Sequence, residues 1–84
     1  LVSQSRRAAV SIASNIAEGQ GRGSAKEFRQ FLLVSKGSLS ELETQLILAR
    51  ELGFADPKQV LTLLEFCDEV GKSLNALIKS IYKA

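Results

Sequence analysis

The dominant feature of this sequence is an apolar stripe that recurs every three or four residues along two long segments. In the segment 25–52 the stripe consists of Phe28, Leu32, Ser35, Leu39, Leu42, Leu46 and Ala49. In the segment 57–82 it consists of Val60, Leu64, Cys67, Gly71, Leu74, Ile78 and Ile81. Spacings that alternate between four and three place side chains on one face of an α-helix. Each segment is therefore predicted to form a helix that buries one face.

Local signals mark the ends of these two helices. Ser24 and Glu27 have the spacing of a capping box, in which each side chain can satisfy a backbone amide of the first turn. Asp56 followed by Pro57 is typical of a helix start, because proline lacks only an N–H group that would be unpaired there anyway. Gly53 suits the residue that follows a helix end.

A further helix is predicted over residues 1–18, where Ile12 and Ile16 lie one turn apart among small residues. Gly19 is expected to end this helix in a left-handed conformation. Short connections make neighbouring helices run antiparallel. The sequence thus predicts an all-α, antiparallel up-down helix bundle that forms a single domain over residues 1–84, with helices at about 1–18, 25–52 and 57–82.

Composition limits the chemistry that the chain can perform. The 84 residues include one cysteine and no histidine, so neither an internal disulfide nor a histidine-based catalytic or metal site can form. We therefore expect a protein that is not an enzyme, with no catalytic residues, no metal and no cofactor. A chain of this size hides only roughly 60% of its unfolded surface, which favours stabilisation by partner subunits.

The sequence also indicates where the protein works. No apolar run approaches the length of a membrane helix, and the first residues lack the apolar core of a signal peptide. A lone thiol is typical of a reducing compartment. These features predict a cytoplasmic protein with no membrane partner.

Charge is distributed unevenly along the chain. Residues 1–40 carry six basic and two acidic side chains, residues 41–69 carry two and seven, and residues 70–84 carry three and none. A basic surface attracts the phosphate backbone of a nucleic acid. It equally attracts the acidic surface of a neighbouring subunit, and a plain solvated surface explains the same pattern. The charge pattern alone leaves these three interpretations open.

Two groups of polar residues are candidate functional sites. Around the start of the second helix, glycines and the basic residues Arg22, Lys26 and Arg29 could form an anion site. The full nucleic-acid or anion-binding hypothesis comprises Arg6, Arg22, Lys26, Arg29 and Lys36. The alternative is a loop and cap that interact only with water. The second group is a predicted polar seam between the first two helices, including an Arg7–Glu41 ion pair; it comprises Gln4, Arg7, Ser11, Asn15, Glu18, Ser38 and Glu41. Its alternative is an ordinary exposed polar face.

Several strings are similar to those of a known family. They are Arg-Ala-Ala-Val-Ser-Ile at 7–12, Asn-Ile-Ala-Glu-Gly at 15–19, Glu-Phe at 27–28, Phe-Leu at 31–32 and Gly-Ser-Leu at 37–39. Together they closely resemble the bacterial four helix bundle protein family, over most of the chain. Members of that family include proteins encoded in intervening sequences of large-subunit ribosomal RNA genes. The accessory variability determinant of diversity-generating retroelements is a relative.

The resemblance implies an up-down four-helix bundle assembled into a ring-like homopentamer. The three helices read here would correspond to the second, third and fourth, so we expect a missing N-terminal helix and an apolar groove in its place. In the retroelement relatives the pentamer binds nucleic acid and a reverse transcriptase. The function expected from the resemblance is a non-enzymatic oligomeric scaffold that binds RNA or DNA through a basic surface. The alternative is a protein–protein interaction adaptor with no nucleic-acid role.

Overall fold

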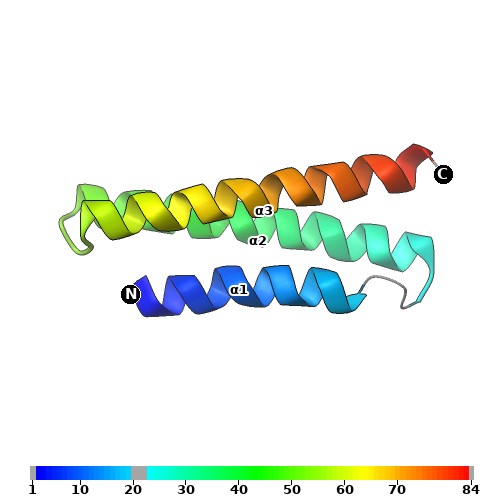
Figure 1. Cartoon of the computed structure of the whole chain (residues 1–84), viewed down its shortest axis with the longest axis horizontal. Coiled ribbons are helices and arrows are strands. Elements are labelled where there is room, and N and C mark those ends of the chain that lie inside the picture. The colour runs from blue at the N-terminus through cyan, green and yellow to red at the C-terminus, as the bar shows by residue number, and fades with distance from the viewer. Residues whose placement is uncertain (1, 20–22, 84) are drawn as a thin grey trace.

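The computed structural model describes residues 2–19 and 23–83, and within them the chain forms three α-helices and no strand. The helices are α1 (Val2–Gly19), α2 (Ala25–Glu51) and α3 (Pro57–Lys83). They run antiparallel to one another in the order up, down, up, and the bundle measures 44 × 19 × 15 Å (Figure 1). The all-α prediction and its three helices are thus confirmed, with ends shifted by one residue. No helix of the described part is long and apolar enough to cross a membrane.

Both ends of α2 have the expected caps. At its start, the Ser24 hydroxyl accepts a hydrogen bond from the Glu27 amide at 3.1 Å. At its end, Gly53 adopts a positive φ of 76°. Its amide donates to the Arg50 carbonyl, and the next amide, that of Phe54, donates to the Ala49 carbonyl at 2.8 Å. This is a Schellman motif, which pairs carbonyls that the helix leaves unsatisfied and reverses the chain toward α3.

The end of α1 differs from the prediction. Gly19 is the last residue of the helix and does not adopt a left-handed conformation; among the described residues the glycines with positive φ are Gly23 and Gly53. A Cβ atom at Gly19 would lie 3.7 Å from the rings of both Phe28 and Phe31. That is an ordinary van der Waals distance, so Gly19 lies against the first turns of α2 and continues the helix instead of capping it in a left-handed conformation.

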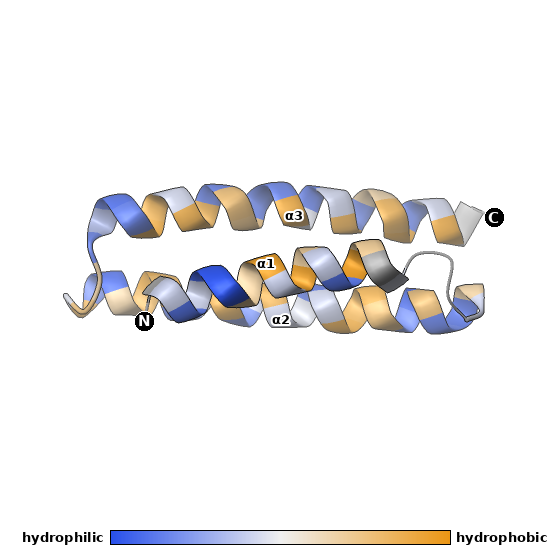
Figure 2. Ribbon diagram, turned by 60° about the horizontal axis from the view of Figure 1, so that its bottom comes forward, coloured by the Kyte–Doolittle hydropathy of each residue, from blue (hydrophilic) through white to orange (hydrophobic). Residues whose placement is uncertain are grey.

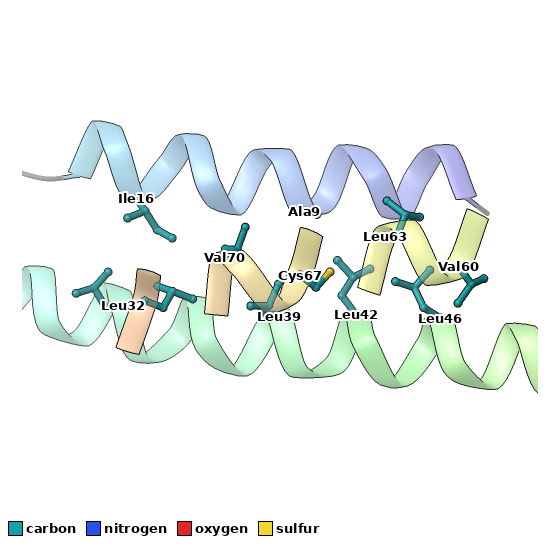
Figure 3. Packing of buried hydrophobic residues seen from close by; sticks show 11 residues of the cluster. Ala9, Ile16, Leu32, Leu39, Leu42, Leu46, Val60, Leu63, Cys67 and Val70 are labelled. Carbon is teal, nitrogen blue, oxygen red and sulfur yellow. The ribbon is translucent and has the colours of Figure 1, made fainter. Parts of the chain in front are cut away.

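The three helices enclose one apolar core, and in Figure 2 the orange side of α3 is turned toward the other two helices. The α2 stripe is confirmed, since all its members except the half-buried Phe28 are buried. On α3, Leu63 and Val70 join the predicted stripe because this helix packs against both of the others. The core cluster, shown in part in Figure 3, consists of Ala9, Ile16, Leu32, Leu39, Leu42, Leu46, Val60, Leu63, Cys67, Val70 and Leu74.

Two glycine substitutions test this account of the α2–α3 turn. We expect Gly53→Ala to lower the free energy of unfolding by about 1–2 kcal/mol, because an L-residue is strained at positive φ. Gly37→Ala is the matched control: a Cβ there meets no atom within 4 Å, and alanine is the better helix former by about 1 kcal/mol. Urea denaturation measures both. Equal shifts in the two variants would contradict the Schellman geometry.

Candidate nucleic-acid interface

The structure separates the five predicted basic residues. Lys26, Arg29 and Lys36 all lie in the first half of α2, where Lys26 and Lys36 are exposed and Arg29 is half-buried. Arg6 lies near the start of α1, toward the opposite end of the bundle (Figure 1). Arg22 lies outside the described residues. Three of the five are therefore brought together on one helix, and Arg6 belongs to a different surface.

Two lysines of α3 extend this basic region. Because α3 runs antiparallel to α2, its second half lies beside the first half of α2 (Figure 1). Lys72 lines the same hollow as Lys36. Lys79 follows Lys72 by seven residues, which places it on the same side of α3, and it is exposed. We call the surface formed by Lys26, Arg29, Lys36, Lys72 and Lys79 the cationic surface.

The sequence contained a signal for these two lysines. Residues 70–84 carry lysines and no acidic side chain. Because α3 runs antiparallel to α2, this stretch lies beside the basic first half of α2. Pairing the charge pattern with the predicted helix directions would have found Lys72 and Lys79.

A hollow of about 200 Å³ lies between α2 and α3 at this surface. It is lined by Lys36, Leu39, Ser40 and Glu43 from α2 and by Cys67, Asp68, Gly71, Lys72 and Asn75 from α3. Leu39 packs against Gly71 beside it, since a Cβ atom on Gly71 would lie 3.5 Å from the Leu39 Cδ2 atom. The missing side chain of Gly71 helps to keep the hollow open.

An ion pair crosses one turn of α3 at the edge of the hollow. The Lys72 Nζ atom lies 3.3 Å from the Asp68 Oδ2 atom, and the two side chains are 78% and 66% exposed. An exposed pair of this kind contributes little to stability. The ammonium group has three donors, so Lys72 can bind an anion while it remains near the carboxylate.

Cys67 lies at the floor of the hollow and is fully buried. Burial raises the pKa of its thiol, and the nearby Glu43 carboxylate raises it further. The thiol is therefore protonated and uncharged at neutral pH, which makes it a poor nucleophile and a poor metal ligand. In the part of the chain that the structure describes, no three side chains of the metal-binding types cluster together.

The predicted polar seam is not formed in the single chain. Among the described side chains, Gln4, Arg7, Ser11 and Asn15 are exposed on α1, and Ser38 and Glu41 are exposed on α2. The Glu18 side chain lies outside the description. No hydrogen bond or ion pair links the described members of the seam across the two helices, so the expected Arg7–Glu41 pair is absent.

Among the side chains of α1 and α2 that the structure describes, the buried polar ones are Ser5 and Ser35, which are not among the residues of the predicted seam. Ser5 and Ser35 are buried, whereas the longer side chains of the predicted seam reach water. A small hydroxyl fits between packed helices, but a guanidinium or carboxylate would lose its hydration there. The polar side of α1 thus matches the alternative of an ordinary exposed face.

The environment of Cys67 predicts slow modification of its thiol. In the native protein we expect reaction with a maleimide to be at least tenfold slower than in urea, because the thiol is both buried and protonated. Reaction rates followed by mass spectrometry at neutral pH test this. Equal rates in the two conditions would show that the α2–α3 interface opens readily.

Comparison with known proteins assigns the chain to a family. A family model described as "23S rRNA-intervening sequence protein" matches residues 1–76, which include α1, α2 and most of α3. The match confirms the resemblance found from the sequence strings. A search of curated proteins returned no match to the chain.

Proposed function

We propose a function on the premise that this chain belongs to the 23S rRNA-intervening sequence protein family, as the match over residues 1–76 shows. In this proposal the protein is a non-enzymatic helical scaffold that binds nucleic acid, and RNA in particular, through its cationic surface. The observation that carries the proposal is the convergence of Lys72 and Lys79 of α3 on the basic first half of α2. Two neighbouring helices thereby offer cations to a phosphate backbone.

Phosphate contacts would supply most of the affinity. Neutralising phosphates releases counterions, so binding by lysine and arginine weakens steeply as salt rises. Stacking on aromatic rings would add little, because Phe28 and Phe31 pack against α1 and the strongly exposed Phe54 lies in the turn at the other end of α2. Contacts of this kind position a strand without selecting its sequence.

The RNA proposal predicts a specific salt dependence. We expect the double variant Lys36→Gln, Lys72→Gln to bind a single-stranded RNA decamer more weakly. The slope of log affinity against log salt should become shallower by about 0.7 for each lysine that contacts a phosphate. Lys58→Gln is the matched control, since Lys58 is exposed at the start of α3, away from the cationic surface. Fluorescence anisotropy across a salt series measures these changes.

Two results would count against the RNA proposal. If the wild-type protein binds neither RNA nor DNA at low salt, the nucleic-acid function is wrong. If Lys58→Gln weakens binding as much as the double variant, the charge of the whole protein matters and the cationic surface does not. Circular dichroism of each variant checks that the helices are retained.

Self-association is the second part of the proposal. Leu48 and the C-cap residue Leu52 lie one turn apart at the end of α2, and Val34 lies on the same side of the helix about 21 Å away, beyond the exposed Glu41 and Gln45. Val34 is 69% exposed and Leu52 is 65% exposed, and Phe54 in the following turn is 74% exposed. Leu48, Leu52 and Phe54 thus expose apolar side chains at the same end of α2, which is typical of a contact with another protein chain. The same surface supports the alternative function, a protein interaction adaptor.

We expect the purified chain to form an oligomer in solution, with a mass several times the 9.1 kDa of one chain. The resemblance implies five copies. Leu52→Glu should reduce this mass, because it places a charge within the apolar contact. Ser14→Glu, at an exposed position of α1, is the matched control. Light scattering coupled to size exclusion measures all three. A wild-type monomer would contradict the scaffold, and equal dissociation of both variants would contradict this surface.

The three helices would be completed by a fourth. Between α1 and α3 lies a hollow of about 280 Å³, lined by Arg6, Val10, Thr62, Leu63 and Phe66. Val10 is half exposed although it is apolar, and Phe66 is only partly buried. An apolar helix packed along this hollow would cover both side chains and would give the up-down four-helix bundle that the resemblance implies.

A further inference from the structure

The side of α2 opposite its buried stripe carries a second line of residues with the same spacing. The line consists of Leu33, Gly37, Ser40, Thr44 and Ile47, each two residues before a member of the buried stripe. Two residues turn an α-helix by about 200°, so this line faces away from the core. All five residues are exposed, and we call them the outer line. An alternation of four and three is the pattern with which one helix packs against another.

Large apolar side chains lie toward both ends of the outer line. Leu33 and its neighbour Val34 are 45% and 69% exposed, and Ile47 and its neighbour Leu48 are 40% and 54% exposed. About 21 Å of helix separates Leu33 from Ile47, and the same length separates Val34 from Leu48. Both pairs are therefore centred close to Ser40. Two apolar patches at equal distances from one point match a partner that carries the same two patches.

Small side chains occupy the middle of the outer line. A Cβ atom on Gly37 would meet no atom within 4 Å, so packing within the chain does not account for a poor helix former there. A shallow depression follows it along the helix, lined by Ser40, Glu41, Thr44 and Gln45. The Thr44 hydroxyl donates to the Ser40 carbonyl at 3.0 Å, so a covering helix would leave this donor paired. Bare backbone in the middle of the line lets a second helix approach closely.

Charge specifies the direction in which a second α2 helix would lie. Lys26 precedes Leu33 by seven residues and Glu51 follows Thr44 by seven, so both lie on the side of the outer line, and both are exposed. The Arg50 Nη2 atom lies 3.2 Å from the Glu51 Oε1 atom, and a carboxylate can accept further hydrogen bonds beside such a neighbour. Parallel packing would bring like charges together at each end of α2. Antiparallel packing brings opposite charges together and is therefore favoured.

We propose that the outer line packs against the same line of a second copy of this chain, with the two α2 helices antiparallel about a two-fold axis near Ser40. The side chains that then face each other between the copies are Leu33 and Ile47, Val34 and Leu48, and Gly37 and Thr44. Lys26 of each copy comes within about one turn of Glu51 of the other. In such a two-fold contact one surface must complement itself, as this one does. The inference rests on the proposed self-association and adds to it the surface and the direction of the contact.

This contact differs from the one that a ring of five would use. A ring is closed by head-to-tail contacts, whereas a two-fold contact joins two copies only. It would pair two single chains or two rings, so the number of copies in the assembly would be even. Leu52 and Phe54 lie beyond the outer line and stay available for ring contacts. Lys36 and Lys72 line the hollow toward α3, to one side of the outer line, and stay available to RNA.

Charge reversal tests the direction of the contact. Lys26→Glu and Glu51→Lys should each weaken the two-fold association about fivefold, because each places like charges within one turn of each other in two symmetric places. The double variant should recover most of the loss. The two positions are about 37 Å apart along one helix, so recovery can only arise between copies. Sedimentation equilibrium over a range of protein concentrations measures the dissociation constants.

A second double variant controls for net charge. Lys26→Glu combined with Glu69→Lys has the same net charge as the recovering variant, but Glu69 is exposed on α3, away from the outer line. It should stay as weak as Lys26→Glu alone. Equal recovery by the two double variants would show that net charge controls association and would overturn the proposed contact.

Two further variants test the packing near the axis. Gly37→Leu should weaken the association at least tenfold, because a large side chain there holds the helices apart although it favours the helix. Ser14→Leu is the matched control, since it adds the same side chain at an exposed position of α1 and should leave the association unchanged. Glu41→Gln should tighten the association about twofold, because the two copies of Glu41 lie near the axis and repel each other.

The outcomes separate this contact from self-association in general. A wild-type oligomer that Gly37→Leu leaves unchanged, or whose charge reversals are not recovered in the double variant, would overturn the antiparallel contact and leave the self-association proposal standing. An assembly with an odd number of copies would do the same. A wild-type monomer at every concentration would overturn both.

Discussion

The contact between α2 and α3 determines most of what this molecule presents to a partner. Two 27-residue helices lie antiparallel, with Leu39 of one helix facing Gly71 of the other. That register places Lys36 beside the second half of α3 and Glu43 near Cys67. A shift of one helical turn would move every one of these polar groups relative to its neighbour. The buried stripe therefore fixes the surface chemistry as well as the core.

The core was predictable from the sequence because the residues that a helix buries recur every three or four positions. The α2 stripe needed only the alternation of four and three, and all but one of its residues are buried. Caps were predictable where a side chain or a positive φ is itself the signal, as at Ser24 and Gly53. The helical conformation of Gly19 was not predicted, because a glycine at the end of a helical pattern is typical of a left-handed cap.

The candidate site was less predictable for a related reason. Lys26, Arg29 and Lys36 were found because they cluster along one segment. Their α3 neighbours Lys72 and Lys79 are far away in sequence and become neighbours only through the antiparallel register. The expected Arg7–Glu41 ion pair is absent for a different reason. Residues that share a helical stripe need not face the neighbouring helix, and long charged side chains are stabilised by turning to water.

Two glycines inside the helices connect stability with the proposed interactions. Each costs about 1 kcal/mol relative to alanine, and neither is needed for packing within the chain, since a Cβ would meet nothing at Gly37 and only ordinary contact at Gly71. Gly71 lines the hollow between α2 and α3 and packs against Leu39, whereas Gly37 leaves the outer side of α2 bare near Val34. Close approach of another helix at Gly37, as in the proposed self-association, would recover the cost there.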